Sequence, residues 1–236
     1  MLKVELHAHT ADDPIDRIPH STHQLIDRAA ELGFDALAVT LHDRQLDIRP
    51  FEGHARERGV TLIPGIERTI EGKHVLLLNF QRGTEDVRSF ADLARLRQEG
   101  QPGLVIAPHP FFPHVACLRD LLERHAGLFD AVECNAMFTA SLNFNRPAIR
   151  WARRHGKPVV GNGDVHRLRQ MGTCFSRVDA ERNADAICAA IRGGKVEVEA
   201  QPISWMHAAG VMSELIFDGV RRTFETVKGD PEYSSR

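Results

Sequence analysis

Short apolar runs alternate along the chain with longer stretches in which apolar residues recur at helical spacing. The apolar runs are rich in Val, Ile and Leu, which is typical of buried strands, and the amphipathic stretches are typical of helices. Strands are therefore predicted at residues 2–6, 35–41, 60–67, 73–80, 103–110, 129–135 and 158–166. Helices are predicted at residues 21–33, 49–59, 84–100, 117–127, 145–156 and 183–194, followed by the run KVEVEA at 195–200.

This alternation predicts an α/β protein with a largely parallel sheet. About seven strand–helix units in 236 residues favour a single domain with a closed or nearly closed (β/α) barrel. The competing architecture is an open doubly wound sheet, but no G-x-G-x-x-G turn follows the first strand, so its dinucleotide-binding form is not expected. The barrel is expected to span residues 1–202, and residues 203–236 to add an amphipathic helix at 204–227 and a loose tail to the same domain.

The composition is that of a globular protein with little net charge. Hydrophobic residues make up 42% and charged residues 26%, the formal net charge is −2, and the pI is about 6.7. This balance lacks the basic excess of proteins that grip long nucleic acid. No apolar run approaches the roughly 20 residues that span a bilayer, and no signal peptide is recognised. The four cysteines are scattered without a C-x-x-C spacing, so we expect reduced thiols and a cytoplasmic location.

Histidine, acidic residues and one asparagine stand at or next to the ends of the seven predicted strands. The carboxyl ends of parallel strands meet at one rim of a barrel, which is where such folds carry their active sites. Each residue alone has an ordinary explanation as a polar strand end, but gathering so many charges without a cation would be costly. The residues are His7 and His9, His42 and Asp43, Glu67, His74 (which begins its strand), His109, Glu133 and Asn135, and Asp164 and His166.

The spacing within two of these pairs fits metal binding. Residues i and i+2 of a strand point the same way, so His7 and His9 can hold one ion. Asp164 and His166 have the same spacing. Imidazole and carboxylate ligands suit zinc, manganese or iron. No cysteine belongs to the set, so a structural zinc site of the cysteine type is not expected.

The segments HAHT, VTLHD, PGIE, KHVLLL, APHP and GNGDVH, in this order, resemble the motifs of the PHP superfamily, the polymerase and histidinol phosphatase domain. The resemblance covers roughly residues 1–200 and implies a distorted (β/α)7 TIM-like barrel that binds up to three divalent ions, Mn2+, Zn2+ or Fe2+. It implies a first ion held by His7, His9, Glu67 and Asp164, a second sharing Glu67 and adding His74 and His109, and a third held by His42, His166 and an aspartate after HAHT.

Two positions depart from the motifs of the superfamily. The superfamily commonly has Asp where this chain has Leu41, and Asp43 is a candidate substitute. The aspartate of the third ion is either Asp12 or Asp13. We favour Asp13, because the Asp-Pro step ends the short turn and directs the carboxylate back to the rim.

The resemblance implies a phosphoesterase in which a metal-bridging hydroxide attacks a phosphate ester at a trinuclear site. Glu67, His42 and Asp164 are the expected catalytic residues. The expected substrate is a small phosphomonoester or a short nucleotide, with no long nucleic acid and no membrane as partner, and the C-terminal helix is a candidate dimer interface. Arg44, Arg68 and Arg167 are candidate phosphate contacts, although a solvated cation is the more ordinary interpretation of each.

Two other classes of protein stay open. A metal-dependent amidohydrolase also carries H-x-H at the end of its first barrel strand, although it normally adds a ligating lysine or a further histidine where this chain has Glu67. A non-catalytic PHP-type module that binds metal for stability or for docking is compatible with Leu41.

Overall fold

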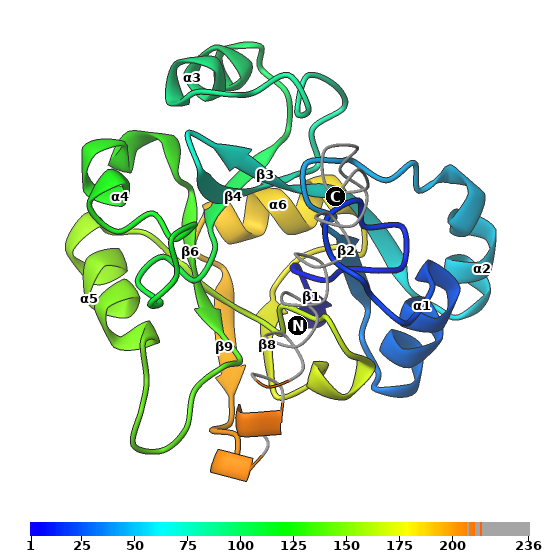
Figure 1. Ribbon diagram of the computed structural model, residues 1–236. Helices are drawn as coiled ribbons and strands as arrows, with labels where there is room; N and C mark the ends of the chain where they lie inside the picture. The colour runs from blue at the N-terminus through cyan, green and yellow to red at the C-terminus, as the bar shows by residue number, and fades with distance from the viewer. Residues whose placement is uncertain (207, 211–212, 214–236) are drawn as a thin grey trace, which may run out of the picture.

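The computed structural model describes residues 1–206, 208–210 and 213. Within these residues one sheet has the strand order β7-β6-β5-β4-β3-β2-β1-β8-β9 and curls around a central axis (Figure 1). The strands are β1 Leu2–Glu5, β2 Ala36–Val39, β3 Thr61–Ile70, β4 Lys73–Leu78, β5 Leu104–Ala107, β6 Ala131–Asn135, β7 Val159–Asn162, β8 Cys174–Val178 and β9 Val196–Ala200.

Short connections bring the two ends of the sheet together, so the barrel is nearly closed. At the rim, Ala8 and Val165 form a parallel bridge between the residues that follow β1 and β7. The bridge is built by the His9 amide donating to the Val165 carbonyl (3.0 Å) and the Val165 amide donating to the His7 carbonyl (3.1 Å). β8 lies beside β1 and also contacts β7. Ser176 Oγ in β8 accepts from the amide of Gly161 in β7 and donates to the carbonyl of Gly161, each at 3.0 Å. The predicted α/β barrel class is confirmed.

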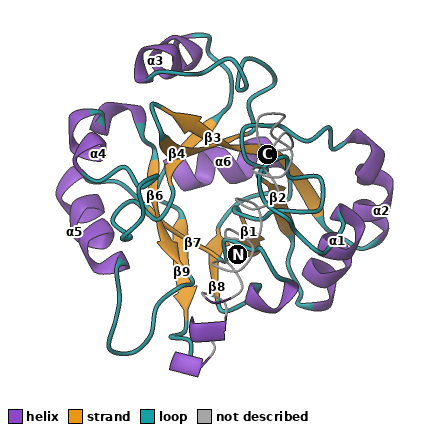
Figure 2. Ribbon diagram, in the orientation of Figure 1, coloured by secondary structure: helices purple, strands orange, loops and turns teal. Residues whose placement is uncertain are grey.

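Helices surround the sheet (Figure 2), and the clearest helix boundaries follow local sequence signals. Ser21 caps α1 and forms a capping box with Gln24, and Ser89 does the same for α3 with Asp92, so α3 begins later than the predicted residue 84. Gly156, in the left-handed conformation at φ 61°, ends α5. The helices are α1 Thr22–Glu31, α2 Glu52–Glu57, α3 Phe90–Gln98, α4 Asp120–Arg124, α5 Asn145–His155 and α6 Ala184–Arg192, with single turns at Arg49–Phe51, Ala126–Leu128 and Leu168–Gln170.

Two outer hydrophobic layers hold these helices against the barrel. On one side α3, α4 and α5 pack on β3 to β6 through a cluster that contains Phe129 and Trp151. On the other side α1 and α2 pack on β2 through a cluster that contains Leu25 and Leu37. Full burial of side chains this large contributes about 1.5–3 kcal/mol each, so the layers fix the strands whose ends carry the polar residues.

The end of the barrel opposite the rim is filled by α6. Its Ile187 and Ile191 pack with inward-facing strand residues such as Val4, Ala36 and Ile63, all nearly inaccessible to solvent. This apolar packing closes the barrel at the end opposite the predicted ligand residues.

The sheet is mixed, which corrects the largely parallel sheet predicted from the sequence. β4 runs antiparallel to both β3 and β5, because Glu71 (φ 49°) and Gly72 (φ 75°) form a two-residue hairpin turn after β3. The start of β4 therefore lies at the rim where the other strands end, which carries His74 there. β8 was not predicted, and it runs antiparallel between β1 and β9.

The expected C-terminal helix at 204–227 and the tail at 229–236 lie largely outside the described residues. Trp205 and Met206 are helical, as are residues 208–210 and 213. In the described part of the chain, no helix is long and apolar enough to cross a membrane.

Candidate metal centre

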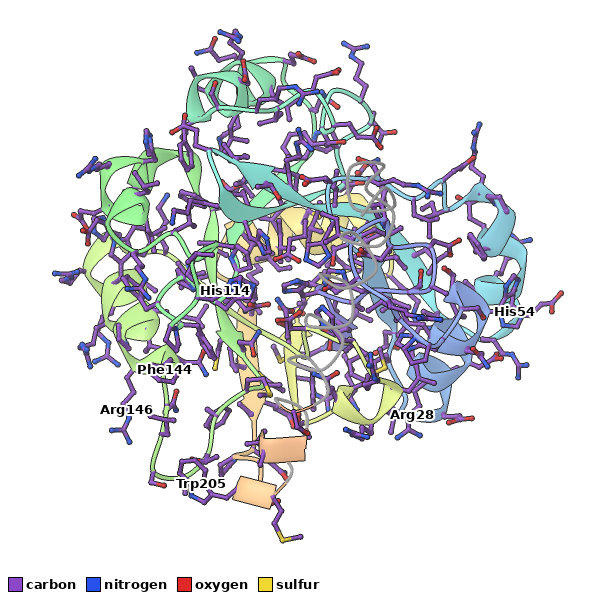
Figure 3. The ribbon with its side chains drawn as sticks, viewed as in Figure 1. Arg28, His54, His114, Phe144, Arg146 and Trp205 are labelled. Atoms are coloured by element: carbon purple, nitrogen blue, oxygen red, sulfur yellow. The ribbon has the colours of Figure 1, made fainter. Side chains whose placement is uncertain are left out.

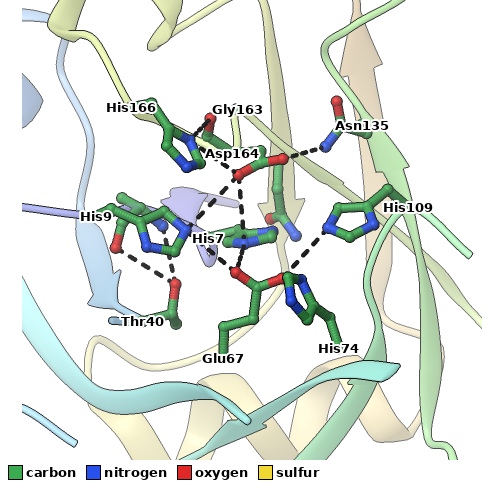
Figure 4. A network of polar contacts seen from close by, with 12 residues as sticks. His7, His9, Thr40, Glu67, His74, His109, Asn135, Gly163, Asp164 and His166 are labelled. Carbon is green, nitrogen blue, oxygen red and sulfur yellow. Dashed lines mark hydrogen bonds and ion pairs between the residues drawn. The ribbon is translucent and has the colours of Figure 1, made fainter. Parts of the chain in front are cut away.

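The structure gathers the predicted ligand residues at one rim, around the carboxylate of Glu67, and Figure 4 labels those other than Asp13 and His42. Both oxygens of Glu67 are buried, and its side chain is 1% exposed. The residues brought together are His7, His9, Asp13, His42, Glu67, His74, His109, Asp164 and His166.

One oxygen of Glu67 faces three imidazoles that come from β1 and β2. Its Oε2 lies 3.1 Å from Nε2 of His7, 3.3 Å from Nε2 of His9 and 3.2 Å from Nε2 of His42. His42 is brought there by a parallel bridge between His42 and Glu67 themselves, which extends the pairing of β2 with β3.

The other oxygen of Glu67 faces two further imidazoles. Its Oε1 lies 2.7 Å from Nδ1 of His74 and 3.3 Å from Nε2 of His109. Glu67 thus stands between two separate groups of nitrogen atoms, one on each oxygen. This is the arrangement expected of a carboxylate shared by two ions.

Asp164 closes the site on the side of β7. Its Oδ1 lies 3.4 Å from Nε2 of His7, 3.7 Å from Nε2 of His9 and 3.4 Å from Nδ1 of His166. Asn135 donates to its Oδ2 at 3.1 Å. The Asp164 backbone has φ 49°, a conformation that non-glycine residues adopt mainly where the surroundings impose it, often at functional sites.

A second layer of carboxylates holds the imidazoles by their outer nitrogens. Glu133 Oε1 lies 2.9 Å from Nδ1 of His7, and Asp13 Oδ2 lies 3.0 Å from Nδ1 of both His9 and His42. A proton on Nδ1 leaves the lone pair on Nε2, which points inward in all three rings. Metal-ligating histidines are commonly oriented in this way.

The charges around Glu67 are balanced by these contacts. Burial would raise the pKa of the Glu67 carboxyl, but the imidazoles of His74, His7 and His42 hold that pKa well below its usual range. Burial likewise opposes protonation of His7, yet the carboxylates of Asp164, Glu67 and Glu133 raise the pKa of its imidazole well above the ordinary value. By contrast, burial and the neighbouring rings of His166 and His42 lower the pKa of His9.

Two buried atoms at the centre of the cluster support metal binding. His9 Nε2 and Asp164 Oδ1 are buried and make no hydrogen bond among the described residues, although they face each other. Four groups of three side chains each place one ligand atom per residue within 4.8 Å of the others. Nitrogen and oxygen donors of this kind suit divalent first-row metals. The groups are His9, His42 and His166; His7, His109 and Glu133; His7, His9 and Asp164; and His42, Glu67 and His74.

The two acidic candidates after HAHT have different surroundings. Asp13 accepts from the amides of Ile15 and Asp16 on one oxygen and meets His9 and His42 with the other. Asp12 is turned away, with its carboxylate bonded to the hydroxyls of Thr10 and Thr22. Asp13 therefore belongs to the site and Asp12 does not contact it.

The side chains of Leu41 and Asp43, the two residues that flank His42, take no part in the ligand cluster around Glu67. Leu41 is fully buried in the hydrophobic layer under α1 and α2. The Asp43 carboxylate accepts from Arg68 Nη1 at 2.8 Å and from the Thr69 amide at 2.6 Å. Asp43 does not replace the missing aspartate, and Arg68 is a buried structural cation. Arg44 donates to the Asp12 carbonyl at 3.3 Å.

Several residues that contact the cluster were not predicted as part of it. Asp16 Oδ2 lies 3.0 Å from Nε2 of His166, and His20 is buried with its Nε2 2.9 Å from the His9 carbonyl. Glu5 is fully buried and accepts from the amides of Gly163 and His7, and burial raises its pKa to about 8 despite these bonds. Glu133 could be found from the sequence because it lies at the end of a predicted strand. Asp16 and His20 lie in a loop, where no strand or motif marks them.

The mixed barrel carries at its rim imidazoles gathered around one carboxylate, an arrangement able to hold metal ions. A family model described as PHP-associated matches residues 143–196. No curated protein matches the chain.

Solved structures share the fold at low sequence identity. PsfC from Pseudomonas syringae is 19% identical with a TM-score of 0.67, over 93% of this chain and 98% of that one. A two-domain protein from Bacteroides vulgatus containing a predicted PHP-like metal-dependent phosphoesterase is 18% identical with a TM-score of 0.65, over 85% of this chain. The match spans only 65% of that longer protein. The lesion-specific endonuclease Q from Pyrococcus furiosus is 15% identical with a TM-score of 0.56, over 84% of this chain and 57% of that one.

The PHP-associated model covers residues 143–196 alone and the low-identity structures share the fold, so the comparisons agree with the resemblance of the sequence motifs to the PHP superfamily. Because a lesion-specific endonuclease has the same fold, the fold gives no support to the expectation that long nucleic acid is excluded as a partner.

Proposed function

We propose that this protein is a metal-dependent hydrolase of phosphate esters. The observation that carries the proposal is the position of Glu67, whose two oxygens face His7, His9 and His42 on one side and His74 and His109 on the other. A carboxylate shared between two clusters of nitrogen ligands is suited to hold two cations close together. Clustered cations lower the pKa of a coordinated water and neutralise charge on a phosphoryl group.

The ligand sets of the proposal follow the clusters. The first ion would be held by His7, His9, Glu67 and Asp164, and the second by Glu67, His74 and His109. The third would be held by His42 and His166 with Asp16, whose Oδ2 faces His166, while Asp13, the aspartate favoured from the sequence, is engaged by the outer nitrogens of His9 and His42.

The chain itself supplies orientation and charge for this chemistry. Glu133 and Asp13 fix the rings of His7, His9 and His42 so that no reorientation is needed when a cation enters. Glu67, His42 and Asp164 stand at the centre, and Asp164 (20% exposed) is more open to an entering substrate than Glu67 (1%). We propose a phosphomonoester or a short phosphodiester as substrate.

The test is a phosphate-release screen combined with elemental analysis. We expect turnover of one or more phosphate esters, loss of turnover after chelation, and recovery with Mn2+. The same preparation is offered amide and lactone substrates, because preferential turnover of those would indicate an amidohydrolase. Bound metal without turnover on either panel would indicate a non-catalytic module.

A further inference from the structure

A basic surface lies beside the metal centre, on α5. Residues 135–163 contain Arg146, Arg150, Arg153, Arg154 and Lys157 but no Asp or Glu, in a chain whose net charge is −2. This segment is therefore strongly positive, although the chain as a whole is slightly negative.

The arginines lie on the outer side of α5. Residues four apart share one face of a helix, so Arg146, Arg150 and Arg154 form a row about 6 Å apart along the axis. The opposite face carries the buried Trp151 and Ala152. Arg146, Arg150, Arg153 and Arg154 are exposed.

These guanidinium groups have no ion-pair partner among the described residues, and the acid that acts on one of them, Glu123 on α4, interacts with Arg154 only through its charge. In the described part of the chain, none of the four forms an ion pair or a side-chain hydrogen bond. Glu123 on α4 accepts from Trp151 Nε1 at 2.8 Å and faces His155 Nε2 at 3.2 Å. An ordinary solvated helix face usually mixes both signs of charge, and this one does not.

Aromatic side chains connect this row with the metal centre. The Phe112 ring lies 6.3 Å from the ring of the proposed ligand His109, and 5.5 Å from the ring of Phe144, which directly precedes α5. Phe144 and Arg146 lie close together at this side of the molecule (Figure 3). Both phenyl rings are half-buried, so each keeps a surface open to a ligand.

The row of arginines also borders a hollow. Phe111, Pro147, Arg150, Arg153 and Arg154 line a depression of about 380 Å³. Guanidinium groups bind phosphate oxygens in a bidentate manner, and exposed aromatic rings stack on bases. Arg150 and Arg154 follow Arg146 by about 6 and 12 Å along the axis of α5, so the surface fits a ligand with several phosphates along its length.

We propose that the α5 arginines, with Phe112 and Phe144, bind a single nucleic-acid strand whose cleaved phosphate lies at the metal centre. The proposal rests on the proposed hydrolase function for the identity of the cleaved group. It names the substrate class of that site as a short single strand.

The test measures binding of a labelled single-stranded oligonucleotide of about 12 nucleotides, a length within the usual site sizes of single-strand binders. Phosphorothioate linkages slow its cleavage in the metal-loaded protein. We expect Arg150→Ala with Arg154→Ala to weaken binding by about tenfold or more. The slope of log K against log salt should fall by about 1.4, because each lost contact to single-stranded phosphate contributes about 0.7.

A matched control is Arg56→Ala with Arg88→Ala, which removes two exposed arginines away from α5 and should leave affinity and slope unchanged. In a second arm, Phe112→Leu or Phe144→Leu should weaken binding by about 5- to 150-fold while leaving the salt slope unchanged. Equal losses of oligonucleotide affinity in the α5 variant and in the control would overturn the proposal. Tighter binding of a duplex or of inorganic polyphosphate than of the single strand would also overturn it.

Hydrolysis of a small chromogenic phosphodiester separates the two proposals. The α5 variant should hydrolyse it as well as the unmodified protein does, because its changes lie outside the ligand cluster. Strand binding with the expected salt slope but no turnover of any phosphate ester would reject the hydrolase function and keep the binding surface. Turnover without strand binding would reject the surface alone.

Discussion

The carboxylate of Glu133 lies 2.9 Å from Nδ1 of His7, on the side of the ring opposite to Glu67. His7 is thus held between two buried carboxylates, with its Nε2 3.1 Å from Glu67. Glu133 also accepts from Asn162 Nδ2 at 2.9 Å and from the His109 amide at 2.8 Å, so its own position is fixed. It contacts the first and second proposed ligand sets together.

We expect Glu133→Gln to lower metal affinity by about 10- to 100-fold, because the amide orients His7 less strongly than the carboxylate does. Competition with a calibrated chelator measures the change. Glu123→Gln is the matched control, since Glu123 is an exposed carboxylate on α4 that also bonds an aromatic N–H and a histidine. Equal affinities for the two variants would show that the second layer does not tune the site.

Glu67→Gln tests the shared carboxylate itself. The substitution keeps the size of the side chain and removes the negative charge that faces five imidazoles, so we expect fewer metal equivalents and a fall in kcat/KM of about 100-fold or more. Metal analysis and phosphate-release kinetics on the same sample check both. Glu57→Gln on α2, an exposed position, should change neither. Full metal content with full turnover in Glu67→Gln would exclude a shared ligand.

The third ion is addressed by comparing two aspartates. Asp16 Oδ2 lies 3.0 Å from His166 Nε2 and 3.9 Å from His42 Nδ1, whereas Asp13 holds the outer nitrogens of His9 and His42. We expect Asp16→Asn to remove one metal equivalent and leave the others. Asp13→Asn should weaken more than one equivalent, because it disturbs two rings. Loss of a single equivalent in Asp13→Asn, with Asp16→Asn unchanged, would identify Asp13 as the only direct carboxylate ligand.

The sequence was most informative where a residue's position depends on its own strand. The apolar runs located seven strands, and the i, i+2 spacing placed His7 and His9 correctly on one side of β1's extension. The reversal of β4 depends on the turn at Glu71 and Gly72 and not on the strand itself, so a parallel pattern was predicted there. Asp16 and His20 reach the site through a loop whose path is set by tertiary contacts. No period or motif marks such residues.

Gly161 tests the seam of the barrel. A Cβ at this position would lie 2.6 Å from the Phe175 carbonyl oxygen and 2.9 Å from its carbon, both backbone atoms that cannot move aside cheaply. We expect Gly161→Ala to lower the free energy of unfolding by about 1–3 kcal/mol, measured by denaturant unfolding. Gly53→Ala is the control, because a Cβ on α2 meets nothing within 4 Å and should raise helix stability by up to about 1 kcal/mol. Similar stabilities for both variants would show that β7 does not pack this closely on β8.

Metal removal should destabilise the folded protein, because His9 Nε2 and Asp164 Oδ1 are buried without a hydrogen-bond partner among the described residues. A ligand that binds only the folded state adds about 2.7 kcal/mol of stability at a free concentration 100 times its Kd. We therefore expect the Tm of chelator-treated protein to rise when Mn2+ is restored, with a dependence on its concentration. Glu67→Gln should show a much smaller rise under the same conditions. An identical rise in both proteins would mean that the stabilising ions bind elsewhere, and no rise in either would remove the structural argument for a cation at these two atoms.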